Sequence, residues 1–389
     1  MANTAWAFSA LKMAHPPLLA ALAAASRQRI REFGPRALEN TAWSFATLQW
    51  PAGEPLTDAI ASSAIAQITE FGPHECASTA WSFAVMAVPH RPLLTAISSA
   101  SIRNMPAFGP LELSSPAWSF ATLLVRDLPL LESIAAASRR SMTAAGPQSL
   151  ANTPWALATL RVAHPPLFEA ISAAAIPKLS QFATQALANT AWAVATLSVP
   201  DSRPLVDAIA SAAIPKIPQF QPSEVATMAW SCAQLAFPHA PLLDAIASAS
   251  RGMIASGLMD RLAAGMVLQG LTCLEDPSQA LRHLQEMDAR GLEPGALGLG
   301  ALLAALERQP EALHHEVRLL RGLLARRRGG TRVPGEPALA AVGARLAEAA
   351  HVIPALNFLS RAGQAGTGGG LPEAADRVRR ACGGAVEKK

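Results

Sequence analysis

Residues 40–48 read NTAWSFATL, and variants of this phrase recur along much of the 389-residue chain. Its tryptophan returns every 37 or 38 residues, at Trp6, Trp43, Trp81, Trp118, Trp155, Trp192 and Trp230. A fixed period of this length is typical of stacked supersecondary units. The sequence therefore predicts a repeat array that presents an extended surface.

Each period contains two predicted helices. In residues 18–33 the apolar positions follow a spacing of three and four residues, which indicates one buried helical stripe. Gly34 ends this first helix and Pro35 begins the second, because glycine suits a helix end and proline suits a first turn. Residues 35–48 show the same spacing. We expect an all-α superhelical solenoid of 37–38-residue helix-pair repeats.

The tryptophan phrase stops near residue 254, and this change divides the chain. Residues 1–254 are predicted to form the array, which starts in the middle of a repeat. We expect a further helical region over 255–328, then a helix, a glycine-rich linker and a basic tail over 329–389. Met1 lies at the start of the phrase with no presequence before it, so we expect the natural start upstream.

Prolines predict local irregularity. Pro177, Pro215 and Pro218 fall in the last turns of first helices, whereas Pro116 and Pro154 fall inside second helices. A proline inside a helix costs about 3 kcal/mol, so we expect kinks or early helix ends there. A polar column three residues before the tryptophans could alternatively cap a shorter second helix. The column consists of Asn40, Ser78, Ser115, Asn152, Asn189 and Thr227.

Composition limits the classes of function. The chain has 32 Lys and Arg against 28 Asp and Glu, and residues 1–250 contain 14 of each. This balance disfavours strong, indiscriminate binding to nucleic acid. No apolar run is long enough to span a membrane, so we expect no membrane partner. The four cysteines lack the spacing of metal ligands, and we expect free thiols.

Catalytic signatures are absent from the sequence. None of the phosphate-loop, nucleophile-elbow or zinc-protease motifs occurs. His15, His90, His164 and His239 occupy the loops before alternate repeats, too far apart along an array to share a metal ion. We expect no enzyme activity, no cofactor, no metal and no small-molecule substrate.

The repeated phrase resembles a known family. PPLL at residues 16–19, followed by Pro35 and NTAWSFATL, resembles the octotricopeptide repeat, an α-helical-pair repeat of organellar RNA-binding proteins. It is also similar to the repeats of FAST-kinase-like proteins and of mitochondrial RNA-editing substrate-binding complex subunits. Over roughly residues 1–254, the resemblance implies a single-stranded RNA ligand with about one base per repeat. It further implies a mitochondrial or chloroplast location and other ribonucleoprotein subunits as partners.

A second resemblance lies beyond the array, in one pentatricopeptide-like unit with the same implied ligand. The matching residues are Ala280, Leu281, Leu284, Met287, Gly291 and Pro294. The C-terminal RAP domain that is usual in octotricopeptide proteins is not evident in the sequence, which disfavours a nuclease role.

The tryptophan column has two interpretations. The indoles could stack on bases, because stacking tolerates any base sequence. Their constancy beside the apolar stripe favours packing between neighbouring helices instead. Replacing one such buried ring by alanine costs about 3–5 kcal/mol. We therefore expect a structural role for the column.

The candidate RNA-reading residues vary from repeat to repeat on the first helices. We expect the first helices to form a concave face on which these side chains address bases and phosphates. They are Gln28, Arg29, Asp58, Thr95, Arg103, Asn104, Glu132, Arg140, Glu169, Lys178, Asp207, Lys216 and Asp244. The acidic members have an alternative explanation, either as a solvated face or because a carboxylate in a first turn is stabilised by the helix dipole by less than about 1 kcal/mol.

Two functions follow from these observations. The sequence favours a selective single-stranded RNA-binding protein that acts in organellar RNA processing, stability or editing. The alternative is a protein-binding scaffold that uses the same concave face. Variable polar columns favour RNA, and the balanced charge of residues 1–250 favours a protein partner.

Overall fold

The computed structural model describes residues 1–50, 53–276, 278–292, 301–302 and 305. Over these ranges every regular element is helical and none is a strand. The predicted all-α class is therefore confirmed for this part of the chain. The chain divides into two compact units, Met1–Lys216 and Ile217–Lys389, called here the N-terminal and C-terminal units. The predictions for 329–389 lie outside the described residues.

Each tryptophan phrase lies on an α-helix, called here a second helix, and the α-helix before it is called a first helix. The second helices of the N-terminal unit are α1 (Ala2–Ala10), α3 (Pro35–Thr47), α5 (Pro73–Val85), α7 (Pro110–Thr122), α9 (Pro147–Thr159) and α11 (Thr184–Leu197). Its first helices are α2 (Pro16–Gln28), α4 (Glu54–Ala66), α6 (Arg91–Asn104), α8 (Leu128–Ser141), α10 (Pro165–Ala175) and α12 (Arg203–Ala213).

Glycine and proline set the start of most second helices. Gly34, Gly72, Gly109 and Gly146 have extended backbone at the N-cap, and a proline follows each at the first helical position. The proline has no N–H to leave unpaired there, and its fixed φ suits the helix. A short 3-10 turn lies between each first helix and the following second helix. In the first four repeats these turns are η1 (Ile30–Glu32), η2 (Ile68–Glu70), η3 (Met105–Ala107) and η4 (Met142–Ala144).

The second helices end in a left-handed residue that is not glycine. The residues at this turn have φ between 46° and 56°, and they are Lys12, Gln49, Ala87, Leu124, Arg161, Ser198 and Ala236. The N–H of the next residue returns to a carbonyl five residues earlier, as Trp50 does to Phe45 at 3.0 Å and Val125 to Phe120 at 2.8 Å. This bond is the one that closes a Schellman turn. The sequence did not predict it, because glycine is the usual residue there.

The predicted apolar stripes form the core of the N-terminal unit. On α2 and the turn after it, Leu19, Leu22 and Ile30 are buried, and on α3 Leu38 and Phe45 are buried. Removing such a side chain from water contributes about 1.5–3 kcal/mol. Helix α3 packs against α1, α5 and the first helix that follows it, α4, and α2 packs against α4, so neighbouring helices cover these stripes.

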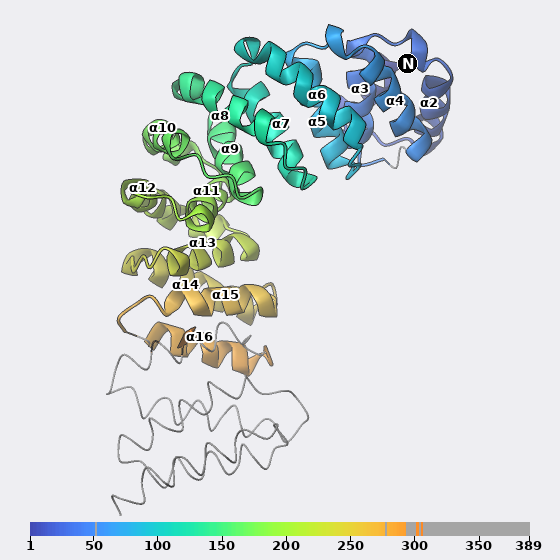
Figure 1. Ribbon diagram of the computed structural model, residues 1–389. Coiled ribbons are helices and arrows are strands. Elements are labelled where there is room, and N and C mark those ends of the chain that lie inside the picture. The colour runs from blue at the N-terminus through green and yellow to red at the C-terminus, as the bar shows by residue number, and fades with distance from the viewer. Residues whose placement is uncertain (51–52, 277, 293–300, 303–304, 306–389) are drawn as a thin grey trace, which may run out of the picture. The chain divides into compact units, whose positions relative to one another are not determined.

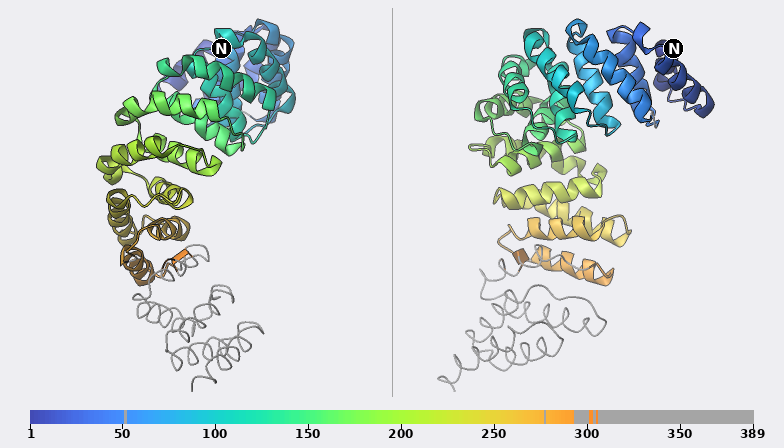
Figure 2. Two further views of the ribbon diagram at one scale, coloured as in Figure 1. Left: turned by 60° about the vertical axis from the view of Figure 1, so that its left-hand side comes forward. Right: turned by 45° about the vertical axis from the view of Figure 1, so that its right-hand side comes forward.

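The second helices of the N-terminal unit pack more closely against one another than the first helices do. In Figure 1, α7, α9 and α11 lie on the inner side of the bend in this unit, and α8, α10 and α12 lie on its outer side. The further views show its helices stacked in chain order (Figure 2). The sequence prediction placed the concave face on the first helices, whereas the structure places the second helices there.

Prolines have the predicted effect on first helices. Before Pro177 and Pro215, α10 and α12 have 11 residues each, compared with 14 in α6 and α8. A longer 3-10 helix follows each of them. These are η5 (Ile176–Gln181) and η6 (Ile214–Gln219, which contains Pro218). The early ends are therefore confirmed.

Prolines inside second helices behave differently. Pro116 and Pro154 lie within α7 and α9, and both helices continue to the same 13 residues as α3 and α5. The helices do not end early at these two positions, and the alternative, a kink, stays a prediction. Each proline removes the N–H that would bond the carbonyl four residues earlier.

The C-terminal unit also consists of packed helices. Its described helices are α13 (Pro222–Gln234), α14 (Ala240–Ala255), α15 (Arg261–Leu271) and α16 (Ser278–Ala289). Helix α13 packs against α15, and α14 packs against α16. A Cβ atom on Gly270 would lie only 2.5 Å from the Ala229 carbonyl oxygen, so this close approach requires glycine. On α16, Ala280 and Leu284 of the pentatricopeptide-like phrase are buried, while Pro294 lies outside the described residues.

Candidate functional site

An open groove crosses the second helices of the N-terminal unit. It has a volume of about 680 Å³ and extends from Trp43 on α3 to Asn189 on α11. On α5, α7 and α9, residues seven, four and three positions before the tryptophan line it, because this spacing places them on one face of the helix. On α9 these are Gln148, Ala151 and Asn152. None of the described residues that line the groove is Lys or Arg.

The tryptophans are half-buried and not enclosed. Trp43, Trp81 and Trp118 line the groove, and Trp6 on α1 is 47% exposed. The rings of Trp118 and Trp155 contact each other, with centroids 6.4 Å apart and planes tilted by 30°. Trp118 and Trp155 thus pack between neighbouring second helices, as predicted, but the rings are not fully buried. The column packs along the groove and stays partly open to solvent.

Two polar columns lie beside the tryptophans on the same helical face. The column seven residues before them is exposed and varied, and it consists of Arg36, His74, Leu111, Gln148 and Gln185. The column three residues before them is half-buried, and it consists of Asn40, Ser78, Ser115, Asn152 and Asn189. The second column was the alternative set of N-caps. That alternative is wrong, because these residues lie in the second turn of full-length helices.

Four residues of the half-buried column fall into two groups, those that bond to the preceding helix and those whose amides have no partner. Ser78 donates a hydrogen bond to Oε1 of Glu39 at 2.5 Å, and Ser115 donates one to the Ala77 carbonyl at 3.2 Å, so both serines tie their helix to the preceding one. The side-chain amides of Asn152 and Asn189 have no hydrogen-bond partner within the described residues. These two amides are therefore available to a ligand.

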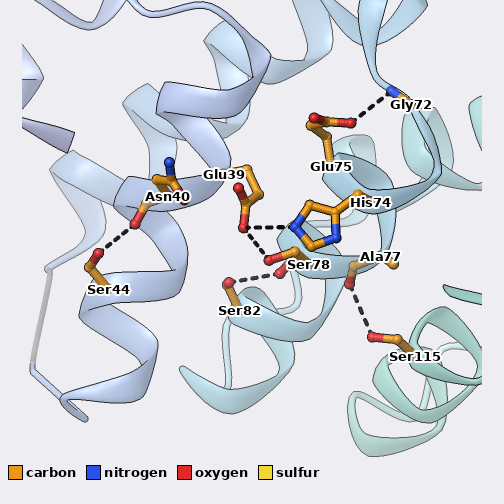
Figure 3. A network of polar contacts seen from close by, with 10 residues as sticks. All are labelled: Glu39, Asn40, Ser44, Gly72, His74, Glu75, Ala77, Ser78, Ser82 and Ser115. Atoms are coloured by element: carbon orange, nitrogen blue, oxygen red, sulfur yellow. Dashed lines mark hydrogen bonds and ion pairs between the residues drawn. The ribbon is translucent and has the colours of Figure 1, made fainter. Parts of the chain in front are cut away.

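One end of the groove contains a buried carboxylate. Glu39 on α3 is only 4% exposed, and the same column has Ala or Ser on the following second helices. Figure 3 shows the Glu39 carboxylate between Ser78 and His74 of α5. The His74 Nε2 atom lies 4.0 Å from Oε1 of Glu39, and the imidazole is largely solvent-exposed. The hydroxyl of Ser78 and the nearby imidazole compensate for removing this charge from water.

The acidic column predicted for the N-terminal unit lies on its first helices, called here the outer row, and not in this groove. Asp58, Glu132, Glu169 and Asp207 are each the fifth residue of their helix, beyond the first turn. The explanation by a first-turn dipole is therefore wrong, because the dipole effect fades beyond that turn. In the C-terminal unit, Asp244 likewise follows four residues after the start of α14 and accepts a hydrogen bond from Gln279 at 2.9 Å.

A second group of the predicted RNA-reading residues connects one repeat to the next through side-chain hydrogen bonds. The ammonium of Lys178 donates to the Ala145 carbonyl at 2.8 Å, and that of Lys216 donates to the Phe182 carbonyl at 2.6 Å. Asn104 donates equivalently to the Phe71 carbonyl at 3.3 Å. These bonds satisfy carbonyls in the turn of the preceding repeat, which accounts for the three side chains without RNA.

The other predicted residues of the outer row are exposed. Arg29 is paired with Glu32, whose pKa is lowered by that guanidinium. The remaining exposed members are Gln28, Thr95, Arg103 and Arg140. The structure does not bring any of the predicted residues into the groove of the second helices.

The alternating histidines are helix caps, which the sequence analysis missed. The Nδ1 atoms of these imidazoles accept hydrogen bonds from the backbone N–H three residues later, at 3.1–3.2 Å. The capping residues are His15, His90, His164 and His239. Asp127 caps α8 in the same way at 3.1 Å. The sequence contained a signal for these caps, because each of the four histidines lies one or two residues before a proline in the first turn of its helix.

The described residues give little support for metal binding or for a reactive cysteine. No three His, Cys, Asp or Glu side chains in these ranges cluster in a way that could hold a metal ion. Burial raises the pKa of the Cys76 thiol to about 11 and that of Cys232 to about 12, so both stay protonated and unreactive at neutral pH. The helices described here are all too short or too polar to cross a bilayer.

Comparison with known proteins leaves the family assignment open. No protein-family model matches the chain, and no curated protein matches it either. The resemblances to octotricopeptide and pentatricopeptide repeats therefore stay predictions.

Proposed function

We propose that the chain binds single-stranded RNA, without catalysis, along the groove of its second helices. The observation that carries this proposal is the combination of half-exposed indoles with unpaired Asn and Gln amides on one helical face. Exposed aromatic rings stack on bases of any type, and side-chain amides form hydrogen bonds with base edges. The groove thus offers both kinds of contact that single-stranded RNA recognition uses.

The finer architecture belongs to the same proposal. We propose that helix pairs of 37–38 residues stack into a superhelical solenoid, with the second helices lining its inner surface. The close packing of α3, α5, α7, α9 and α11 supports this arrangement. Alanines next to the tryptophans, such as Ala46, Ala84 and Ala121, are buried and allow the close approach.

The spacing of the tryptophan column suits one nucleotide per repeat. The 6.4 Å between the Trp118 and Trp155 ring centroids is close to the length of one nucleotide in an extended single strand. These two rings contact each other, so a base cannot enter between them. Bases would instead lie on the exposed parts of the rings, with the amides of the same helix at their edges.

The phosphates would lie at the edge of the groove. The groove lining lacks Lys and Arg, so it suits bases and not the charged backbone. At its edge, where Pro147 lines the groove, α9 begins at Gly146 without a side-chain cap, and a Cβ at this glycine would meet open space. Exposed N–H groups and the dipole at such a helix start favour a phosphate.

The biological setting is proposed from the resemblance alone. We place the protein in a mitochondrion or chloroplast, in RNA processing, stability or editing, with other ribonucleoprotein subunits as partners. The described residues contribute the RNA surface to this proposal and not the location.

A protein-binding scaffold is the second candidate. The lack of Lys and Arg in the lining favours it, together with the lining residue Glu112. An extended peptide rich in polar and basic side chains would meet the same amides and indoles. RNA is preferred because a peptide does not require a flat aromatic ring on each successive second helix.

A binding titration tests the proposed function. Fluorescence anisotropy of a short random-sequence RNA should show binding that a duplex of equal length competes for poorly, since a duplex hides its bases. With about two to four phosphate contacts, a plot of log affinity against log salt should have a slope of roughly −1.4 to −2.8. Absence of RNA binding, together with enrichment of peptides from a displayed library, would establish the scaffold instead.

A further inference from the structure

Two neighbouring second helices present the same pair of side chains to the groove. These are Gln148 and Asn152 on α9, and Gln185 and Asn189 on α11. In each pair the two residues are one helical turn apart, so both side chains lie on one face. The glutamines are exposed and the asparagines half-buried.

The two second helices directly before them, α5 and α7, differ at both positions, whereas α3 shares only the asparagine, as Asn40. Helix α5 has His74 and Ser78, and α7 has Leu111 and Ser115. The hydroxyls of Ser78 and Ser115 are already bonded to the helix before them. Leu111 is 58% exposed and can form no hydrogen bond through its side chain. The α9 and α11 pairs are therefore distinct from their neighbours and equivalent to each other.

Chemical equivalence of two subsites determines what they select. An amide carries a donor and an acceptor side by side, as do the edges of bases. Residues of the same type at the same helical positions impose the same pattern of donors and acceptors. We infer, on the basis of the proposed RNA function, that α9 and α11 hold two successive bases of the same kind. The preferred RNA would then contain a pair of identical neighbouring bases.

Exchanging the residues of this column tests the inference. The double variant Asn152→Ser, Asn189→Ser introduces the residue that α5 and α7 already contain. In a selection from a random RNA pool, the natural chain should enrich two adjacent identical bases. The double variant should lose the preference at those two positions.

A second variant makes the converse change. Leu111→Gln with Ser115→Asn gives α7 the pair found on α9 and α11. This variant should extend the enriched motif to three identical neighbouring bases. Circular dichroism of both variants shows whether the helices are retained, and Gln148→Ala with Gln185→Ala replaces the serine variant if that one does not fold.

The outcomes separate the two proposals. No RNA enrichment by the natural chain, or enrichment of peptides only, would overturn the proposed function and this inference with it. RNA enrichment without a pair of identical bases would overturn the inference alone. The inference would also fail if the double variant kept the pair, because other residues would then select these bases.

Discussion

At the start of α10, Nδ1 of His164 accepts a hydrogen bond from the backbone N–H of Leu167 at 3.1 Å. Asp127 makes the equivalent bond on α8 through its carboxylate. Replacing His164 by Ala should lower the free energy of unfolding by about 1 kcal/mol, whereas His164→Asp should retain the cap. Urea unfolding followed by circular dichroism measures both. An equal loss in the two variants would show that the imidazole acts by packing and not as an acceptor.

His283 on α16 predicts a pH dependence. Its Nε2 atom lies 2.9 Å from the Ala264 carbonyl and its Nδ1 atom 3.2 Å from the Ser250 hydroxyl. Burial lowers the pKa of His283 to about 4, and the positive charge of Arg251 acts in the same direction. The unfolded chain takes up this proton near pH 6.5, before the folded chain does.

The sign of the effect follows from that difference. The neutral His283 stabilises the fold fully above about pH 6.5, and up to about 3 kcal/mol is lost as the pH falls towards 4. Carboxylates titrate over part of this range, so the His283→Gln variant serves as the reference. Urea unfolding at several pH values should show a steeper decline for the natural chain. Parallel curves for the two proteins would contradict the assignment.

Some residue roles could be predicted and others could not. The buried stripe of Leu19, Leu38 and Phe45 was predictable, because burial follows directly from helical spacing. The role of Lys178 was not, because its acceptor is a carbonyl 33 residues earlier that only the stacked repeats bring within reach. A polar column on one helix does not show whether its partners lie in the protein or in a ligand.

At the scale of elements, α9 permits a test of the helix-interior proline. Other second helices have Ala at the position of Pro154, as Ala42, Ala80 and Ala117 show. Pro154→Ala restores an N–H that can bond the Leu150 carbonyl, so it should raise the free energy of unfolding by about 1–3 kcal/mol. Chemical unfolding of the single variant measures the change. A loss of stability would show that the ring of Pro154, which is buried, is needed for packing.

The elements also show where prediction from sequence ends. Proline and glycine marked the starts of most second helices, since both have specific backbone preferences. The helix ends at residues such as Gln49 and Leu124 were not visible, because neither residue favours positive φ. The tryptophan period identified which residues share a face. It did not reveal which row of helices lies inside the bend, because that depends on how closely each row packs.

At the scale of the whole molecule, the chain consists of two compact units. The groove belongs to the N-terminal unit, and none of the predicted outer-row residues lines it. The candidate site therefore lies on the second helices, whereas the sequence predicted it on the first helices. The signals in the sequence were the polar column beside each tryptophan and the small residues that flank the ring.

The choice between the two rows is the central claim, and added negative charges test it. Gln148→Glu with Gln185→Glu adds two negative charges to the groove at exposed positions with almost no change in shape. Gln28→Glu with Thr95→Glu adds two negative charges to exposed positions of the outer row. Both sites are solvent-exposed, so both variants should unfold like the natural chain.

The decisive measurement is the dissociation constant of a short random-sequence RNA for these two variants and the natural chain. RNA in the groove predicts that the groove variant binds about tenfold or more weakly, while the outer-row variant stays within about twofold of the natural chain. The reverse order would place RNA on the first helices and contradict the account.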